Sequence, residues 1–288
     1  GKMLDNRYEL LEVIGSGGMA VVYKAKCHRL NRLVAVKVLK SDLAEDADFR
    51  RRFRDESQAV AMLSHPNIVS VYDVSRGETE YIVMELIDGI TLKQYMERRG
   101  RLNWRESLHF ITQIMKGLSH AHSRGIIHRD IKPENIFISD NGDYKLGDFG
   151  IARTIERTTS GLSKKGTYSY MAPEVYAGRE YGFSVDTYSL GLVLYRMLNK
   201  NRGPFLPQPP DDITFAGREQ ALARRISGER LPRPFYGEGR LGEIVLKACA
   251  FDPKDRYSSP QQMRQELEAI LYTQTDAGII YPSGDELS

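Results

Sequence analysis

The sequence predicts an α+β protein with two lobes, a small antiparallel β lobe with one helix and a larger, mainly helical lobe. Its first part is rich in short runs of Val, Ile and Tyr separated by Gly-rich or polar turns, which is typical of an antiparallel meander. Beyond residue 88, apolar residues recur every three or four positions, which indicates amphipathic helices. The length of 288 residues and the hydrophobic fraction of 41% are enough for one large or two medium-sized domains.

Five strands and one helix are predicted in the first lobe. The strands are expected at 8–14, 20–25, 33–39, 68–74 and 81–86. The helix is expected at 47–64, which contains neither Gly nor Pro and is followed by His65-Pro66-Asn67. We interpret the arginines at positions 50, 51, 52 and 54 as the solvated face of this helix.

The second lobe is predicted to contain four helices, one of them buried. They are expected at 104–125, 184–199, 241–250 and 260–271. The helix at 184–199 is apolar on nearly every side, so we expect it in the middle of the lobe. The proline-rich stretch 204–210 is expected to be an irregular surface loop.

These patterns predict one domain at residues 8–272, followed by a tail or linker at 273–288. Within the domain, the small N-terminal lobe is expected at 8–86 and the larger C-terminal lobe at 90–272. A cleft between two lobes is where ligands usually bind, so we expect the site there.

The composition argues against several classes of partner. Lys and Arg number 41 against 38 Asp and Glu, and the net charge of +3 is too small to indicate nucleic acid. The longest nearly apolar stretch, 190–195, is far shorter than the roughly 20 residues of a membrane helix, so no membrane span is expected in this chain. Cys27 and Cys249 lack metal-ligand spacing, which favours a reducing, cytoplasmic location.

A glycine-rich segment joins the first two expected strands. Glycines let the backbone approach phosphate oxygens and direct N–H groups at them. Strands on both sides favour a phosphate-covering flap over a Rossmann turn, which needs a helix after the glycines, and a plain hairpin turn is the alternative. The residues of this candidate phosphate-covering flap are Ile14, Gly15, Ser16, Gly17, Gly18, Met19, Ala20, Val21 and Val22.

Lys37 ends an apolar strand, where a half-buried cation needs an anionic partner. Glu56, in the helix that follows, is the expected partner, and Glu45 is the weaker candidate because it precedes the helix interior. A single strand lysine more often faces solvent, so the functional interpretation of Lys37 depends on the segments that follow it.

Two later segments decide that interpretation. His128-Arg-Asp-Ile-Lys-Pro-Glu-Asn135 precedes an apolar strand expected at 135–139, and Asp148-Phe-Gly150 comes thirteen residues after Asn135. Together with the glycine-rich segment and Lys37, in this order, they resemble the signature set of the eukaryotic-type protein kinases. The resemblance extends from about residue 8 to 271, is especially similar to bacterial members, and implies the two-lobed protein-kinase-like fold.

The resemblance implies transfer of the γ-phosphate of ATP, with Mg²⁺ or alternatively Mn²⁺ as the metal. Asp130 is expected to orient the acceptor hydroxyl and take its proton, and Lys132 to neutralise the γ-phosphate. Lys37, held by Glu56, is expected to bind the α- and β-phosphates. The expected metal ligands are Asn135 and Asp148.

The resemblance also implies where adenine binds. Ile14, Val22 and Ala35 are expected on one side of the ring and Phe137 on the other. Met84 is expected at the back of this pocket, with hydrogen bonds from adenine to the backbone of Glu85 and Leu86.

Further residues indicate the substrate class or have structural roles. By resemblance, Lys132 and Thr167 favour protein substrates with Ser or Thr, since tyrosine kinases typically carry Ala and Arg in the stretch around Lys132. Glu174 is expected to pair with Arg256 as a structural anchor, and Asp186 to brace the turn at His128 and Arg129.

Arg129 directly precedes Asp130, which is the arrangement in relatives switched by phosphorylation. Arg153 follows where the family often places a second phosphate-binding cation. We therefore predict autophosphorylation on one of the hydroxyls of Thr158, Thr159, Ser160 and Ser163. Many bacterial relatives are tethered by a membrane helix and some dimerise, so a tether outside this chain and a homodimer are further expectations.

Two other functions compete with a protein kinase. A pseudokinase would bind nucleotide without turnover, but Lys37, Asp130, Asn135 and Asp148 are all present. A kinase of small metabolites would not need the segment from Gly166 to Glu174, which resembles a platform for peptide substrates.

Overall fold

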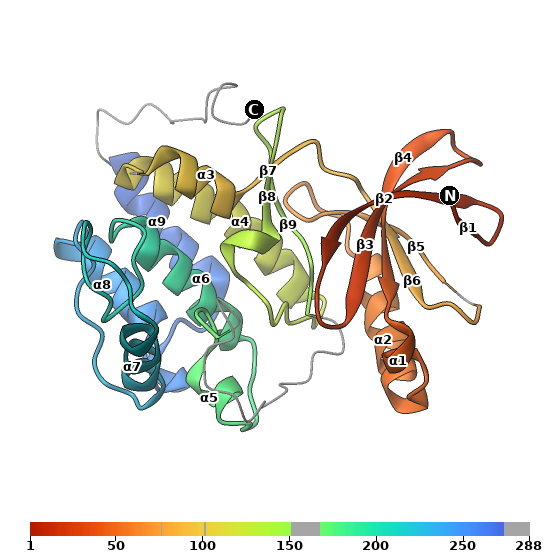
Figure 1. Cartoon of the computed structure of the whole chain (residues 1–288). Coiled ribbons are helices and arrows are strands. Elements are labelled where there is room, and N and C mark those ends of the chain that lie inside the picture. The colour runs from red at the N-terminus through yellow and green to blue at the C-terminus, as the bar shows by residue number, and fades with distance from the viewer. Residues whose placement is uncertain (76, 101, 151–167, 274–288) are drawn as a thin grey trace. The chain divides into compact units, whose positions relative to one another are not determined.

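The computed structural model describes residues 1–75, 77–100, 102–150 and 168–273. These residues form two compact units. Figure 1 shows the chain coloured by residue number. The first unit contains residues 1–88 with Gly150, and the second contains the other described residues, 89–149 and 168–273. The first is built mainly of strands and the second mainly of helices, which confirms the predicted fold class.

An antiparallel six-stranded sheet forms most of the first unit, with the strand order β1-β2-β3-β4-β6-β5. The five predicted strands are present, and the short β1 is an addition that the sequence did not indicate. Strand β5 begins at Val71 and not at residue 68 as predicted. A turn precedes it, in which the N–H of Ile68 donates to the carbonyl of His65 at 3.1 Å. The strands are β1 (Met3–Leu4), β2 (Tyr8–Ser16), β3 (Ala20–Cys27), β4 (Arg32–Leu39), β5 (Val71–Val74) and β6 (Tyr81–Met84).

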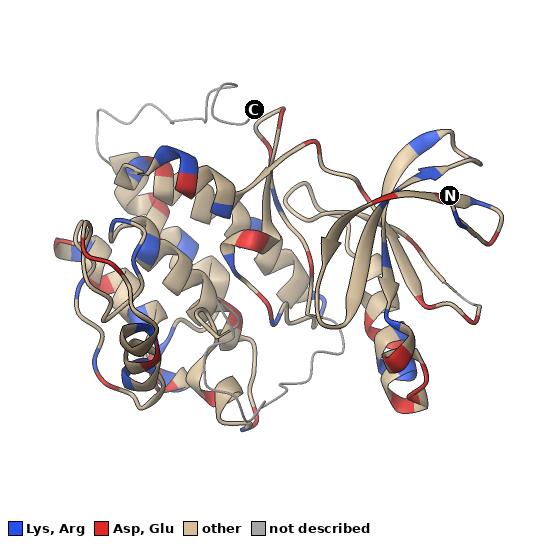
Figure 2. Cartoon of the chain, in the orientation of Figure 1, with Lys and Arg blue, Asp and Glu red and all other residues tan. Residues whose placement is uncertain are grey.

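The predicted helix of the first unit is α2 (Ala47–Ala61), preceded by one unpredicted turn, α1 (Ser41–Ala44). Asp46 caps α2 by accepting hydrogen bonds from the N–H groups of Asp48 and Phe49 at 3.0 and 3.2 Å. Figure 2 shows acidic and basic residues interleaved on α2.

The interpretation of the arginines on α2 as a solvated face is wrong for two of the four. Arg50 and Arg54 both bind Glu80, whose side chain is fully buried, and the Arg50 contact measures 3.1 Å. A buried carboxylate needs cationic partners, and strand β6 brings Glu80 up beside the helix. Arg51 and Arg52 are exposed as expected.

The second unit contains the four predicted helices and a small sheet of order β7-β8-β9. The predicted helices are α4 (Trp104–Ser123), α6 (Ser184–Met197), α8 (Gly239–Ala248) and α9 (Pro260–Thr273). The unpredicted helical elements are α3 (Leu92–Arg99), α5 (Pro173–Tyr176), α7 (Phe215–Ile226) and the 3-10 turns η1 (Pro133–Asn135) and η2 (Pro253–Asp255). The strands are β7 (Gly89–Thr91), β8 (Ile136–Ser139) and β9 (Tyr144–Leu146).

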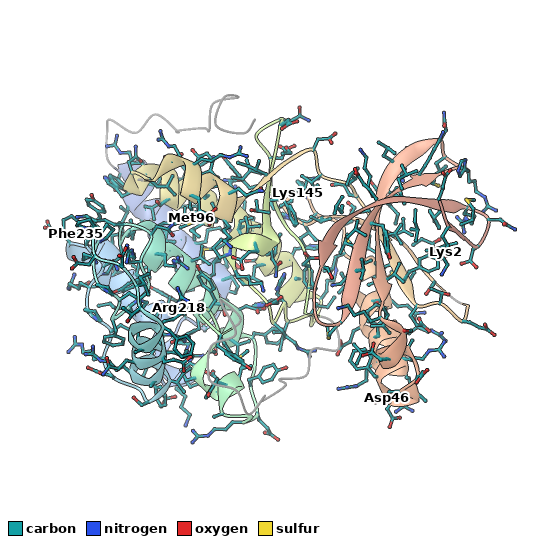
Figure 3. All side chains as sticks on the ribbon, in the orientation of Figure 1. Lys2, Asp46, Met96, Lys145, Arg218 and Phe235 are labelled. Carbon is teal, nitrogen blue, oxygen red and sulfur yellow. The ribbon has the colours of Figure 1, made fainter. Side chains whose placement is uncertain are left out.

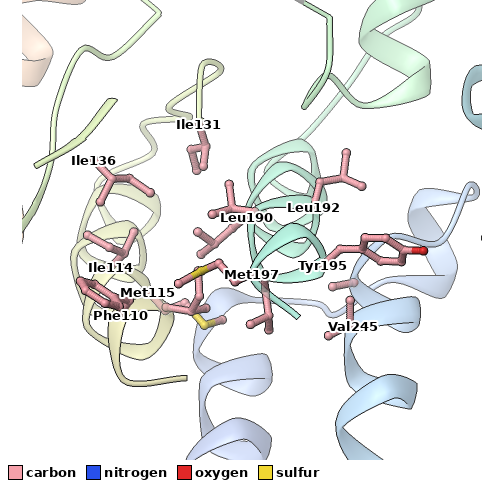
Figure 4. Close-up of a cluster of buried hydrophobic side chains, with 14 of the residues drawn as sticks. Phe110, Ile114, Met115, Ile131, Ile136, Leu190, Leu192, Tyr195, Met197 and Val245 are labelled. Carbon is pink, nitrogen blue, oxygen red and sulfur yellow. The ribbon is translucent and has the colours of Figure 1, made fainter. Parts of the chain in front are cut away.

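Helix α6 lies in the core of the second unit, as its sequence predicts. Its Leu190, Leu192 and Tyr195 are at most 1% exposed, and they pack with side chains of α4 and α8 (Figure 4). Gly191 lets α6 lie close to α8, because a Cβ there would lie 2.8 Å from the Cβ of Ala248. A polar side chain on this helix is therefore held by the packing of the whole unit.

Three smaller expectations can be placed. Residues 204–210 form neither helix nor strand, as predicted, although Pro204 is buried. Of the expected tail at 273–288, only Thr273 falls among the described residues, and it ends α9. Within the described ranges, none of the helices combines the length and the apolar character needed to cross a bilayer.

Replacing Gly191 by Ala should lower the free energy of unfolding by about 1–3 kcal/mol, because the added methyl group overpacks the contact between α6 and α8. Urea denaturation followed by circular dichroism measures this change. Gly182→Ala is the matched control, since a Cβ at Gly182 meets no atom within 4 Å. Equal stabilities of the two variants would show that the two helices can separate without cost.

Candidate active site

The first unit places four expected nucleotide-binding residues on one face of its sheet. Lys37 lies directly opposite Val22 on the neighbouring strand, and Ala35 lies opposite Met84. Residues 35 and 37 of β4 point to the same face because strand side chains alternate. The other face packs into a closed apolar cluster that includes Val34, Val36 and Val83. The pattern leaves Lys37 in a partly buried position on the opposite face.

The glycine-rich segment forms the connection between β2 and β3. The N–H of Gly17 donates to the carbonyl of Ala20 at 3.0 Å, and the register shifts between Val13 and Gly15. None of Gly15, Gly17 and Gly18, all described, has a positive φ. A Cβ at Gly15 would approach no atom closer than 3.7 Å, and one at Gly18 would meet open space. Neither backbone strain nor packing within the described chain requires these glycines.

The other expected residues of this half lie on separate elements. Glu56 is a partly buried residue of α2, whereas Glu45 lies in the turn between α1 and α2. Glu85 directly follows β6, and its N–H donates to the carbonyl of Ser70 at 2.9 Å. A hydrogen bond between the Glu85 backbone and adenine would therefore use the Glu85 carbonyl as acceptor.

The second unit brings two expected catalytic residues and one expected metal ligand into contact. The amide nitrogen of Asn135 donates to the carboxylate and to the carbonyl of Asp130, at 3.0 and 2.6 Å. Lys132 Nζ lies 3.9 Å from Asp130 Oδ1, and both side chains are about a quarter exposed or less, at 24% and 22%. Because the nitrogen of Asn135 faces Asp130, its amide oxygen is the atom it presents to a cation.

His128 joins the segment of Asp130 to the segment of Asp148. Its Nδ1 accepts from the N–H of Asp130 at 3.0 Å, so Nε2 carries the proton and donates to the carbonyl of Gly147 at 2.7 Å. The ring also packs against Phe149, with 4.4 Å between ring centroids. Burial holds the pKa of His128 below its ordinary value, which keeps the ring neutral and preserves both bonds.

The expected role of Asp186 is confirmed. Its carboxylate, 1% exposed on α6, accepts from the N–H groups of His128 and Arg129 at 2.7 and 2.9 Å. His122 Nε2 lies 2.7 Å from the same carboxylate. Arg129 has a φ of 74°, a left-handed conformation that is rare for residues other than glycine. The two hydrogen bonds that the backbone donates to Asp186 hold the loop in this conformation.

Asp148 is fixed by its neighbours on both sides. The N–H of Gly147 donates to the carbonyl of Asn135 at 2.9 Å, and Phe149 packs on His128. Asp148 itself has a φ of 47°, so a second residue of the expected site is held in the left-handed region. Such conformations cluster at functional sites, where the surrounding structure over-determines them.

The donor set of Asn135 and Asp148 fits a hard divalent cation. An amide oxygen and a carboxylate are oxygen ligands, and Mg²⁺ commonly takes one or two of these from protein and the rest from water and phosphates. In the described part of the chain, no group of three or more His, Cys, Asp or Glu residues could hold a metal on its own.

The predicted anchor between Glu174 and Arg256 is confirmed. Arg256 donates to both carboxylate oxygens of Glu174, at 2.6 and 2.8 Å, and both residues are buried. Removing one partner of such a pair leaves an unpaired buried charge, which costs about 3–5 kcal/mol. The pair ties α5 to the loop before α9.

Arg225 positions the chain just before α5, and its pattern in the sequence did not predict this role. This buried side chain donates to the carbonyls of Met171 and Tyr168, at 2.6 and 2.7 Å, and to Tyr188 Oη at 3.1 Å. It lies on α7, a helix that was not predicted. The expected roles of Arg153, Gly166, Thr167 and the hydroxyls of Thr158, Thr159, Ser160 and Ser163 fall outside the described residues.

Comparison with known proteins identifies the family. The model of the protein kinase domain matches residues 8–267. The chain belongs to the protein kinase family. It is 40% identical over 274 residues to the serine/threonine-protein kinase PrkC of Bacillus subtilis, covering 94% of this chain and 41% of PrkC. It is 39% identical over 279 residues to PknB of Mycobacterium tuberculosis, covering 93% of this chain and 43% of PknB.

Solved structures of this kinase family agree with the fold. The crystal structure of the PknI kinase domain of Mycobacterium tuberculosis matches with a TM-score of 0.67 and 28% identity, covering 91% of this chain and 95% of that one. The resemblance to bacterial members is thereby confirmed. The chain spans about two fifths of the length of PrkC and PknB.

Asp186→Asn should destabilise the second unit by about 1–3 kcal/mol. The substitution replaces one carboxylate oxygen, which accepts from a buried N–H, by an NH₂ group, so that two donors face each other. Urea denaturation measures the loss. Asp212→Asn, at an exposed loop position, is the matched control and should leave stability unchanged. The role assigned to Asp186 is wrong if the two variants unfold at the same urea concentration.

His128 should remain neutral, with the proton on Nε2, as the pH falls through its ordinary pKa of about 6.5. Below a pH of about 6.5, His128 becomes protonated in the unfolded chain but stays neutral in the folded chain. Protonation therefore stabilises the unfolded chain, and the free energy of unfolding decreases as the pH falls. Nitrogen-15 NMR of the imidazole ring, assigned with His128→Gln, reports the tautomer. A midpoint near 6.5 would contradict the two hydrogen bonds.

Proposed function

We propose that this chain is a serine/threonine protein kinase domain that transfers the γ-phosphate of ATP to Ser or Thr hydroxyls of proteins. The observation that carries the proposal is the arrangement of Asp130, Lys132 and Asn135, tied through His128 to the segment of Asp148. Phosphoryl transfer needs positioning and charge neutralisation more than covalent chemistry, and this arrangement supplies both.

In the proposed reaction, the acceptor hydroxyl oxygen forms a bond to the γ-phosphorus while the bond to the β–γ bridging oxygen breaks, which releases ADP. The carboxylate of Asp130 accepts the hydroxyl proton, and Lys132 neutralises charge on the transferred group. Asn135 and Asp148 would hold Mg²⁺, which neutralises the phosphates when bound. The bonds from Asn135 to Asp130 keep the carboxylate oriented.

The proposed nucleotide-binding residues lie mainly in the first unit. Lys37 binds the α- and β-phosphates and Glu56 holds Lys37. Support comes from the shared face of Val22, Ala35, Lys37 and Met84 and from glycines that the fold itself does not require. A close approach of phosphate explains why they are glycines. The proposed residues of the first unit are Ile14, Gly15, Ser16, Gly17, Gly18, Met19, Ala20, Val21, Val22, Ala35, Lys37, Met84, Glu85 and Leu86.

We further propose that autophosphorylation between residues 158 and 163 activates the kinase. The motivation is the cluster of hydroxyls at Thr158, Thr159, Ser160 and Ser163 with Arg129 and Arg153 as phosphate-binding cations. Peptide mass spectra after incubation with ATP test this, and the absence of phosphate between 158 and 163 would rule it out.

The location and assembly of the kinase are also part of the proposal. ATP and reduced thiols, such as the free Cys27 and Cys249, suit the cytoplasm. A membrane tether outside this chain is consistent with relatives more than twice as long. Cell fractionation tests the tether, and light scattering tests the proposed homodimer.

Asp130→Asn should reduce phosphate transfer at least about 100-fold, since a general base typically contributes 10²–10⁴ in rate. The assay uses γ-labelled ATP and Mg²⁺ with the chain itself, a generic Ser/Thr protein and a small alcohol as acceptors. Asp140→Asn, an exposed residue of the turn between β8 and β9, is the control and should retain activity.

The outcomes of this assay separate the competing functions. Labelling of protein by the wild type alone supports a protein kinase, whereas labelling of the alcohol alone supports a kinase of small metabolites. A wild type that remains unlabelled while Mg-ATP raises its melting temperature indicates a pseudokinase, because a ligand that binds the folded state stabilises it without turnover.

A further inference from the structure

A cavity of about 430 Å³ in the second unit has not been given a role. It lies between η1, helices α3, α6 and α7, and residues 168–170. It is far larger than the roughly 30 Å³ of one water molecule, so it has room for a side chain. Its charged lining residues are Lys93, Glu134, Arg196, Arg218 and Arg225. We call this cavity the basic pocket.

The basic pocket carries an excess of positive charge. Four cations face one carboxylate, that of Glu134, and none of the four forms an ion pair within the described part of the chain. Figure 3 labels Arg218 on α7, and Figure 2 shows basic residues along α3, the helix that carries Lys93. Exposed cations alone would be unremarkable, but Arg196 and Arg225 are bound into the structure.

The two bound arginines have neutral partners. Arg196 donates to Tyr170 Oη at 2.6 Å and to the carbonyl of Asn201 at 3.3 Å, and its buried Nε has no hydrogen-bond partner in the described structure. Arg225, 5% exposed, donates to two carbonyls and to Tyr188 Oη. Hydroxyls and carbonyls orient a guanidinium but leave its charge uncompensated, so the pocket keeps its attraction for an anion.

The basic pocket adjoins the catalytic segment. Glu134 lies in η1, between Lys132 and Asn135. It is four residues from Asp130, so their Cα atoms are at most about 14 Å apart. Another wall, residues 168–170, is fixed by Arg225 and by Ser189, whose Oγ donates to the carbonyl of Tyr170 at 2.6 Å. A peptide whose hydroxyl reaches Asp130 can therefore place a nearby side chain in this pocket.

We propose that the basic pocket binds an acidic group of the protein substrate close to the acceptor hydroxyl, so that this kinase prefers acidic sequences. The anion is a carboxylate of Asp or Glu or the phosphate of an already phosphorylated residue. This inference rests on the proposed kinase function and specifies its substrate class. Charge-assisted hydrogen bonds to guanidinium groups supply the preference.

Peptides with one Thr test the proposal. Glu, Lys or Ala is placed in turn at each of the five positions on either side, and a phosphoserine series separates phosphate from carboxylate. At one or more positions, kcat/KM for Glu should exceed that for Lys at least about tenfold, as expected for one or two charge-assisted hydrogen bonds. Raising the salt concentration should shrink the difference, because ions screen exposed charges.

Charge-reversal variants connect the preference to the basic pocket. Arg218→Glu and Lys93→Glu, both on the rim, should each remove most of the Glu preference while changing kcat/KM for the Ala peptide less than about twofold, because a neutral side chain makes no charge-assisted contact. Arg230→Glu is the matched control, an exposed arginine of the same unit outside this pocket, and should keep the preference. The proposal is overturned if no position favours Glu, or if both rim variants retain the wild-type preference.

Fluorescence anisotropy of labelled peptides separates this proposal from the kinase function. Tighter binding of Glu peptides without phosphate transfer would support the basic pocket while the kinase proposal fails. Phosphate transfer with equal binding and equal rates for Glu and Lys peptides would support the kinase and eliminate the basic pocket as a substrate site.

Discussion

The candidate site in the second unit depends on one buried carboxylate, that of Asp186. It accepts hydrogen bonds from the backbone of His128 and Arg129 and thereby fixes a loop that includes a residue with positive φ. Asp186 can do this because α6 lies in the core, where close packing leaves its first turn no freedom to shift. His128 in turn donates a hydrogen bond to the carbonyl of Gly147, which holds the residue next to Asp148. The packing of the apolar core therefore fixes the geometry of the polar site.

Two groups of charged side chains in the described residues are held in different ways. Glu174 with Arg256, and Glu80 with Arg50 and Arg54, are paired, which offsets the cost of removing them from water. Arg225 and Arg196 instead bind carbonyls and hydroxyls and keep their charge available. Paired charges anchor segments of the fold. Arginines held by neutral groups make a surface that selects ligands by charge.

Much of the fold was predictable because its pattern is local. The strands and helices that were predicted carry alternation or helical periodicity in their own residues, and the Asp186 and Glu174–Arg256 contacts followed from the family resemblance. Helices α3 and α7 were not predicted. They begin at the caps Thr91 and Thr214, and isolated helices of 8 or 12 residues are marginal without tertiary packing. Glu80 was missed as the partner of Arg50 because 30 residues separate them.

The sequence by itself determined which chemical groups are present and in what order, since the spacing of His128, Asp130, Asn135 and Asp148 is a property of the chain. Only the tertiary structure decided which polar atoms meet. Asp186 lies 58 residues from His128, and Arg225 lies 54 residues from Met171. An arginine has five donors and a carboxylate two oxygens, so each could serve many partners. Packing selects among them, because a buried polar group must be satisfied by whatever the folded chain places within hydrogen-bond distance.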